Sequence, residues 1–259
     1  MQLTFTALLL TFGLFIAIIV CMELGRHFGQ IALARNTGGL PKGIGAAEGA
    51  IFGLLGLLIA FTFSGAAGRF EERRHLITEE ANDIGTAWLR IDLLPAEAQP
   101  EVRDLFRRYL DSRLAIYQDV NNPQTVATKL AASAELQNQI WAKATQAAHR
   151  PGASPSAPML LLPALNAMFD ITTTRTRAAQ NHPPMVVVLL LPTLVLIAAI
   201  LVGFDLSENK VRQPLHILAF AAVMSLTVYV IVDLEFPRLG LIRVDSSDQV
   251  LVDLRASMN

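Results

Sequence analysis

Residues 45–76 read GAAEGAIFGLLGLLIAFTFSGAAGRFEERRHL. The part from Gly49 to Gly68 carries no charge and is long enough to cross the roughly 30 Å hydrocarbon layer of a bilayer as a helix. No proline occurs from Lys42 to Leu94, and proline is the residue that most often breaks a helix. We therefore expect one long helix that crosses the membrane and continues beyond it.

Three further stretches of similar length also lack charged residues, which makes four in all. Lipid forces a spanning chain into helices, because its backbone groups find no water to bond. We expect four transmembrane helices at Leu3–Met22, Ala46–Ala67, Met185–Phe204 and Leu215–Val232. The first is expected to stay as an uncleaved anchor, because no basic residue precedes Arg26.

The composition agrees with a chain that is solvated partly by lipid. Of the 259 residues, 53% are hydrophobic and 17% are charged, whereas soluble proteins average about 25% charged residues. The formal net charge is -1, whereas a nucleic-acid-binding protein usually carries an excess of basic residues, so no nucleic-acid partner is expected. The single cysteine, Cys21, excludes an intrachain disulfide and a paired-cysteine metal motif.

Most of the charge lies between the second and third spans. Residues 69–184 hold 13 of the 21 basic and 13 of the 22 acidic residues. Helix-forming segments are expected there at 69–94, 101–120, 124–149 and 159–181, because prolines separate them. The predicted fold class is therefore an all-α membrane protein, with four transmembrane helices and a helical cytosolic domain inserted between the second and third. The expected segments are 1–68 for helices 1 and 2, 69–184 for the cytosolic domain, 185–234 for helices 3 and 4, and 235–259 for a C-terminal cytosolic segment.

The helix expected at 101–120 is amphipathic. Apolar residues at helical spacing form its buried face, and charged residues form the other face. The apolar set is Val102, Leu105, Phe106, Tyr109, Leu110 and Leu114, and the charged set is Arg103, Asp104, Arg107, Arg108 and Asp111. Such a helix needs a partner to cover its apolar face, so we expect a small helical bundle.

Signatures of catalysis and cofactor binding are absent from the sequence. The five histidines are scattered, and no two stand at i and i+4. Gly43–Gly49 has Glu48 where a nucleotide-binding loop has its third glycine, and no strand precedes it. There is no phosphate-binding loop and no serine between two glycines as in a nucleophile elbow. We expect no enzyme activity, no catalytic residue, no cofactor and no metal site.

Small residues recur at helical spacing along the second span. One stripe consists of Gly45, Gly49, Gly53, Leu57, Phe61 and Gly65, and an adjacent one of Gly56, Ala60, Ser64 and Ala67. Small residues let helices approach closely, so Gly45, Gly49, Gly56, Ser64 and Gly65 are candidates for helix packing within one protomer. Alternatively, several copies of this helix surround an axis. Leu57 and Phe61 then form an apolar constriction, with Glu48 at one pore mouth and Arg69 and Arg73 at the other.

The segment Leu57–Leu76 resembles the second helix of bacterial bestrophins, which has a Leu-Ala-Phe step followed by Arg-Phe-Trp-Glu. Glu79–Ile84 stands where that family has its Val-Asn-Asp/Ala segment, and Pro237–Ile242 matches its Pro-Arg-x-Gly-x-Ile close. The whole chain is similar to the bestrophin-like family of bacterial membrane proteins.

This resemblance implies a pentameric, mostly chloride-selective ion channel with a helical cytosolic domain. It places Gly53, Leu57 and Phe61 at the hydrophobic neck, where the family normally has bulky residues at all three positions. Gly53 departs from that pattern, and Glu71 stands where bestrophins have an aromatic residue. Regulation by calcium is not expected, because the acidic residues after the fourth span are dispersed.

Two functions follow as hypotheses. The first is an oligomeric channel that passes chloride or other small inorganic ions, with membrane lipid and further copies of the chain, a pentamer by resemblance, as its partners. The second is a non-conducting membrane scaffold or sensor, whose helical domain binds a cytosolic partner. Arginine and lysine near the spans are more frequent on the side of the termini and central domain, which favours a cytoplasmic-membrane protein with these parts in the cytoplasm.

Overall fold

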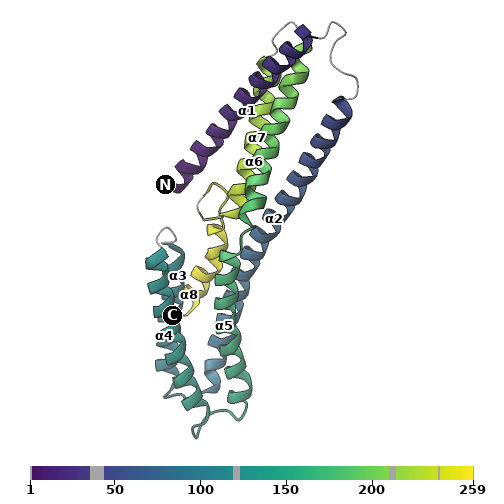
Figure 1. The fold of residues 1–259 in the computed structure, drawn as a ribbon. Coiled ribbons are helices and arrows are strands. Elements are labelled where there is room, and N and C mark those ends of the chain that lie inside the picture. The colour runs from purple at the N-terminus through teal and green to yellow at the C-terminus, as the bar shows by residue number, and fades with distance from the viewer. Residues whose placement is uncertain (1, 36–43, 119–122, 210–213, 239, 259) are drawn as a thin grey trace. The chain divides into compact units, whose positions relative to one another are not determined.

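The computed structural model describes residues 2–35, 44–118, 123–209, 214–238 and 240–258. These residues form helices joined by short connections and contain no strand (Figure 1). The α-helices are α1 (Gln2–Arg35), α2 (Ile44–Arg90), α3 (Gln99–Gln118), α4 (Pro123–Ala148), α5 (Ala157–Gln180), α6 (Met185–Asp205), α7 (Pro214–Glu235) and α8 (Gln249–Ser257). Three short 3-10 helices, η1 (Ile91–Leu93), η2 (Leu206–Glu208) and η3 (Asp245–Asp248), complete the described elements.

Four stretches of helix are long and apolar enough to cross a membrane: Phe5–Arg35, Gly45–Leu93, Ala157–Glu208 and Pro214–Glu235. Each contains one of the predicted spans almost entirely. The all-helical class and the four apolar helices are therefore confirmed. The expectation of one unbroken helix from the second span onward is also confirmed, because α2 runs for 47 residues without interruption.

The chain divides into two compact units. The apolar unit comprises Met1–Phe70 and His182–Arg243, and the polar unit comprises Glu71–Asn181 and Val244–Asn259. The first part of α2 belongs to the apolar unit and its second part to the polar unit. The predicted segment boundaries after residues 68, 184 and 234 stay predictions, as does the cytosolic location of the inserted segment.

In the apolar unit, the closest helix packing is between α1 and α6, at Gly25 and Gly29 of α1, which stand four residues apart, and at Gly203 of α6. A Cβ atom added to Gly25 would lie 1.9 Å from the carbonyl oxygen of Ile200, and one added to Gly203 would lie 1.9 Å from that of Met22. Real Cβ atoms do not approach so closely, so only glycine lets these two backbones touch. Around this contact, Ile18, Met22, Val195, Ala198 and Ala199 are fully or almost fully buried.

The polar unit buries the predicted apolar face of α3. Val102, Phe106, Tyr109 and Leu110 are at most 1% exposed, and Leu105 is also buried. Trp88 of α2 packs against Phe106 with ring centroids 6.1 Å apart. Leu114 is only half-buried, and Arg113 beside it is almost fully buried, which the sequence pattern did not predict.

The C-terminal segment covers the charged face of α3 within the polar unit. Arg107 donates to the backbone oxygen of Met258 at 2.5 Å, and Arg255 of α8 bonds Asp111 at 2.8 Å and 3.1 Å. Burial of Leu251 and Met258 adds apolar contact. The charges of this face are therefore partly used for docking α8.

Candidate functional site

The predicted constriction lies on the outward face of α2. Leu57 and Phe61 are 51% and 67% exposed, and Gly53, Ala60 and Ser64 on the same face are exposed too. On the opposite face, Leu55 and Ala66 are at most 3% exposed, within the core of the apolar unit. The helix thus has one face packed within the chain and one that the chain leaves open.

The glycines predicted for helix packing have little to pack against within the chain. A Cβ atom added to Gly45, Gly49, Gly53 or Gly56 would meet no atom within 4 Å. One added to Gly65 would meet the Arg69 guanidinium at 3.3 Å, and Ser64 is exposed. Their role in packing therefore stays a prediction, and it would need a partner from outside this chain.

Glu48, a predicted pore-mouth residue, lies on the packed face of α2. Its side chain is 5% exposed, and its carboxyl group contacts that of Asp205 at the end of α6. The Glu48 Oε1 atom is buried and has no hydrogen-bond partner. The residue is thus turned about half a helix circumference away from Leu57 and Phe61.

Arg69 also lies on the packed face, and it forms a bidentate ion pair with Glu235 at the end of α7. Its Nε atom is 3.1 Å and 2.9 Å from the two carboxylate oxygens, and its Nη2 atom is 2.8 Å from Oε2. His182 adds a contact from its Nδ1 atom to Glu235 Oε1 at 3.0 Å. The Glu235 side chain is only 7% exposed, so its carboxylate is stabilised mainly by its ion pair with Arg69 and little by water.

Arg73 lies one turn further along the same face, inside the polar unit. It is 8% exposed and donates to the backbone oxygens of Ala178 and Asn181, each at 3.1 Å. These carbonyls belong to the end of α5, where a helix leaves its last acceptors without intrahelical donors. Arg73 therefore caps the C-terminal end of α5.

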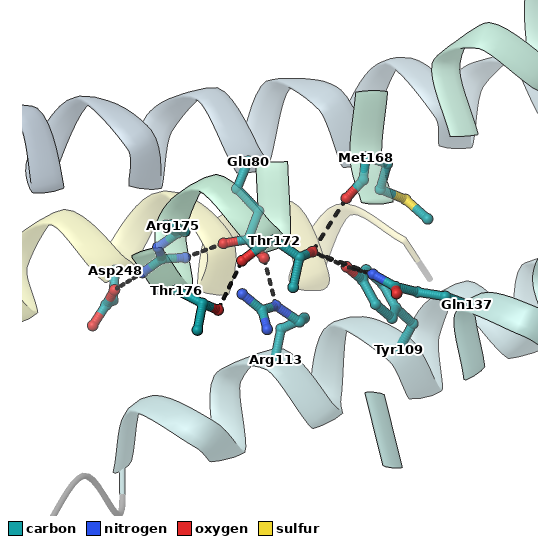
Figure 2. Close-up of polar contacts among 9 residues, drawn as sticks. All are labelled: Glu80, Tyr109, Arg113, Gln137, Met168, Thr172, Arg175, Thr176 and Asp248. Carbon is teal, nitrogen blue, oxygen red and sulfur yellow. Dashed lines mark hydrogen bonds and ion pairs between the residues drawn. The ribbon is translucent and has the colours of Figure 1, made fainter. Parts of the chain in front are cut away.

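A buried ion-pair cluster that the sequence did not predict lies at the centre of the polar unit (Figure 2). Glu80 of α2 is fully buried between Arg113 of α3 and Arg175 of α5. Its Oε1 atom is 2.5 Å from Arg113 Nε, its Oε2 atom pairs with Arg175, and Arg175 also bonds Asp248 at 3.3 Å. One carboxylate thus ties α2, α3 and α5 together, and Asp248 extends the cluster to η3.

The electrostatics of Glu80 follow from this geometry. Burial alone raises the pKa of the Glu80 carboxyl, but the attraction of Arg113 and Arg175 and their hydrogen bonds outweigh burial and lower it. The carboxyl is therefore ionised at neutral pH. The sequence offered one signal for this role, because Glu80 stands three residues after Ile77 and four before Ile84, both of which belong to a buried face.

Polar contacts continue from this cluster along α3 and α5 (Figure 2). The Tyr109 hydroxyl lies 3.0 Å from Thr172 Oγ1, and Gln137 of α4 donates to both of these oxygens at 3.2 Å. Burial raises the pKa of the Tyr109 phenol, so it stays neutral. The three helices are therefore fixed in register by satisfied buried hydrogen bonds.

The segment that contains Pro237–Ile242 is held by Asp233. The Asp233 carboxylate accepts hydrogen bonds from the backbone nitrogens of Leu241, at 3.0 Å and 3.1 Å, and Ile242, at 2.7 Å. A Cβ atom added to Gly240 would lie 1.4 Å from Asp233 Oδ1, which explains the glycine of this motif. Leu239, within the motif, lies outside the described residues.

These arrangements are those of a helical scaffold with an open apolar face. Among the described residues, no group of three or more His, Cys, Asp or Glu side chains could hold a metal ion. The charged clusters found are ion pairs that join helices, and each carboxylate at their centre is already bonded. Among the described residues, the outward face of α2 is one of the apolar surfaces that the chain itself does not cover.

Comparison with known proteins places the chain among membrane proteins of one family. A family model described as Bestrophin-like domain matches residues 5–249. No protein of curated function matches the sequence.

Three crystal structures of a bacterial bestrophin homologue from Klebsiella pneumoniae share the fold. An isoleucine-to-threonine variant has a TM-score of 0.68 at 16% identity and covers 93% of this chain and 98% of its own. A tryptophan-to-alanine variant has a TM-score of 0.70 at 15% identity, with 93% and 97% covered. The structure phased by Zn-SAD has a TM-score of 0.68 at 15% identity, with 93% and 98% covered.

Proposed function

The chain belongs to the bestrophin-like family, and on that premise we propose that it forms an oligomeric ion channel in the cytoplasmic membrane. In this proposal, α2 of each copy lines a central pore, and the pore passes chloride or other small ions. The segment between the second and third spans forms a helical domain in the cytoplasm. A pentamer is the subunit number that the resemblance to bestrophins suggests.

The outward face of α2 is the observation that carries the proposal. Within one chain, α2 already has a packed face that buries Leu55 and Ala66, so the second face is available for an axis or for other copies. That face alternates exposed bulky residues, Leu57 and Phe61, with small ones. Small residues allow helices to crowd, and bulky apolar ones narrow the space between them.

Leu57 and Phe61 are the proposed constriction, and Gly53 continues it one turn earlier. A ring of such side chains gates ions by excluding water. Because Gly53 adds no side chain, the constriction would be only about one helical turn long, from Leu57 to Phe61. The preference for anions rests on the resemblance.

Charged residues stand near both ends of the proposed pore-lining segment, Glu48 at one and Arg69 and Arg73 at the other. They lie on the packed face, so we propose that they act on the pore through their field and not by contact with ions. Pairing with Glu235 reduces the net charge that Arg69 contributes. The proposed mouth is thus less positive than the arginines alone imply.

Phe61→Ala tests the constriction, with Phe63→Ala as a matched control. Both phenylalanines are exposed, at 67% and 46%, but only Phe61 lies on the stripe with Gly53 and Leu57. In planar bilayers that contain purified protein, Phe61→Ala is expected to raise the single-channel conductance several-fold, and Phe63→Ala to leave it unchanged. Well-folded oligomers that pass no ions would exclude the proposal.

A membrane scaffold or sensor is the second candidate function. It is favoured by Leu89 and Met159 in the polar unit, which are 70% and 79% exposed and could meet a cytosolic partner. Cysteine substitution along residues 53–65, in a chain with Cys21→Ser, separates the two functions. Labelling from water with helical periodicity supports a pore, and uniform protection supports the scaffold.

A further inference from the structure

Arg26 of α1 is a buried cation that forms no ion pair with any residue that the structure describes. It is 7% exposed, and its Nη2 atom donates to the backbone oxygen of Asn209 at 3.3 Å. Its Nε atom is buried and has no hydrogen-bond partner among these residues. Arginine is almost never buried unless its charge is paired. The surroundings of Arg26 therefore lack a negative charge.

Ser207 of η2 adds a second buried donor to the same contact. It is 7% exposed, and its Oγ atom has no hydrogen-bond partner in the described part of the chain. η2 packs on α1 at Gly29, about one turn after Arg26, where an added Cβ atom would lie 2.2 Å from Ser207 Oγ. Asn209, which accepts from Arg26, stands two residues after Ser207. The α1–η2 contact thus holds two donors, the Arg26 Nε–H group and the Ser207 hydroxyl.

Carboxylates of the chain do not supply the missing charge. Three acidic residues stand close to this contact in the sequence, and none forms an ion pair with Arg26 in the described structure. They are Glu23 on α1, and Asp205 and Glu208 on either side of Ser207. Asp205 and Glu208 are exposed. The segments 36–43 and 210–213, which lie outside the described residues, contain no aspartate or glutamate.

We propose that the α1–η2 contact binds a small inorganic anion, such as chloride, between the Nε–H group of Arg26 and the hydroxyl of Ser207. A guanidinium offers only donors, and a serine hydroxyl can add another, so this pair suits an anion and not a cation. Hydrogen bonds that involve an ionised group are roughly twice as strong as neutral ones. Because both residues are buried, the site favours a small anion over a large organic one.

The bound anion joins α1 to η2, the turn that ends α6, so it stabilises the folded apolar unit. It lies on α1 and η2 and not on the outward face of α2. The inference therefore does not depend on the proposed channel, and a protein that conducts no ions could still hold this anion.

Thermal unfolding of the full-length protein tests the site, in a maltoside detergent that contains no phosphate. Sodium gluconate is replaced by sodium chloride at constant ionic strength. A ligand that binds only the folded state raises its stability with the logarithm of the ligand concentration. The melting temperature of the wild type is expected to rise by about 5 °C or more once chloride reaches roughly 100 times its dissociation constant. Arg26→Gln and Ser207→Ala should each lose most of this rise.

Arg35→Gln is the matched control. Arg35 is exposed at the end of the same helix, so this variant should keep the full effect of chloride. If Arg26→Gln does not fold, Ser207→Ala decides, because it removes only a hydroxyl group. Its loss of one hydrogen bond to a charged ligand should raise the chloride concentration of half-maximal effect by about tenfold or more.

Adding phospholipid to the same micelles distinguishes a free anion from a lipid phosphate. Stabilisation by chloride without added lipid, reduced in Ser207→Ala and kept in Arg35→Gln, supports the proposal. Stabilisation by phospholipid with no response to chloride would overturn it, because Arg26 would then bind a lipid headgroup. A melting temperature that does not depend on chloride in the wild type, or that depends on it equally in Ser207→Ala, would overturn it too.

Discussion

Replacing Glu80 by glutamine is expected to destabilise the polar unit more than any similar change on its surface. The substitution keeps the size of the side chain and removes its charge. Glu80 is fully buried and pairs with Arg113, which is 1% exposed, and with Arg175, which is 7% exposed. Both guanidinium groups would stay buried and lose their shared carboxylate.

The size of the effect follows from the cost of leaving a buried charge without its partner, which is about 3–5 kcal/mol. Arg175 keeps its contact with Asp248 at 3.3 Å, so we expect the lower half of this range. In a protein of this size, each kcal/mol corresponds to roughly 2–4 °C in melting temperature. A fall of about 6–16 °C is therefore expected.

Thermal unfolding of the purified protein in detergent, followed by circular dichroism, measures this fall. Glu79→Gln is the matched control, because Glu79 is the neighbouring residue and its side chain is 47% exposed. Its contact with His75 is an exposed pair, and such pairs contribute about 0–1 kcal/mol. If Glu80→Gln melts no lower than Glu79→Gln, the cluster does not hold the helices together and the reasoning fails.

The same cluster predicts a dependence on pH. The pKa of Glu80 is lower in the folded protein than in the unfolded chain, where a glutamate has a pKa of about 4.3. The stability that Glu80 contributes is therefore fully present above that value and is lost as the pH falls through the lower, folded value. The difference in melting temperature between wild type and Glu80→Gln should be constant from pH 6 to pH 8 and shrink in strong acid.

Two further substitutions test packing and anchoring in the apolar unit. Gly25→Ala would place a Cβ atom 1.9 Å from a backbone oxygen of α6, so it should destabilise the protein by about 3 kcal/mol or more. Gly13→Ala is the control on the same helix, because its Cβ atom would meet no atom within 4 Å and the stability should not fall. Equal melting temperatures for these two variants would contradict the close contact. Asp233→Ala removes the acceptor of two backbone nitrogens at a cost of roughly 1–3 kcal/mol, and limited proteolysis should then cleave faster after residue 236. Cleavage at the wild-type rate would show that the carboxylate does not hold this segment.

The sequence was sufficient for those features that depend on local pattern. The charge-free stretches predicted the apolar helices, because length and lack of charge are what lipid requires. The spacing of Val102, Phe106 and Tyr109 predicted the buried face of α3, because burial follows the helical period. In both cases the residues concerned lie close together in the chain.

The charged clusters could not be predicted in the same way, because their members are far apart in the sequence. Arg113 and Glu80 are separated by 33 residues, and Arg69 and Glu235 by 166. A charged residue is on average exposed, so composition places Arg113 and Arg175 on the surface. Only the position of Glu80 on an otherwise apolar helical face hinted that it is buried.

The glycines also show that local sequence pattern does not identify which helices pack together. The run of glycines in α2 is the most visible small-residue pattern in the sequence, yet the close backbone contacts are made by Gly203 and by Gly25 and Gly29, which form only a single four-residue step. Small residues indicate that two helices can approach closely, but they do not indicate which helix is the neighbour. Within the chain α1 and α6 already use that possibility, so the open stripe of α2 points outward, to lipid or to further copies of the chain. Lipid gains nothing from a row of small residues, whereas a neighbouring helix does, and for this reason the stripe favours an assembly around α2.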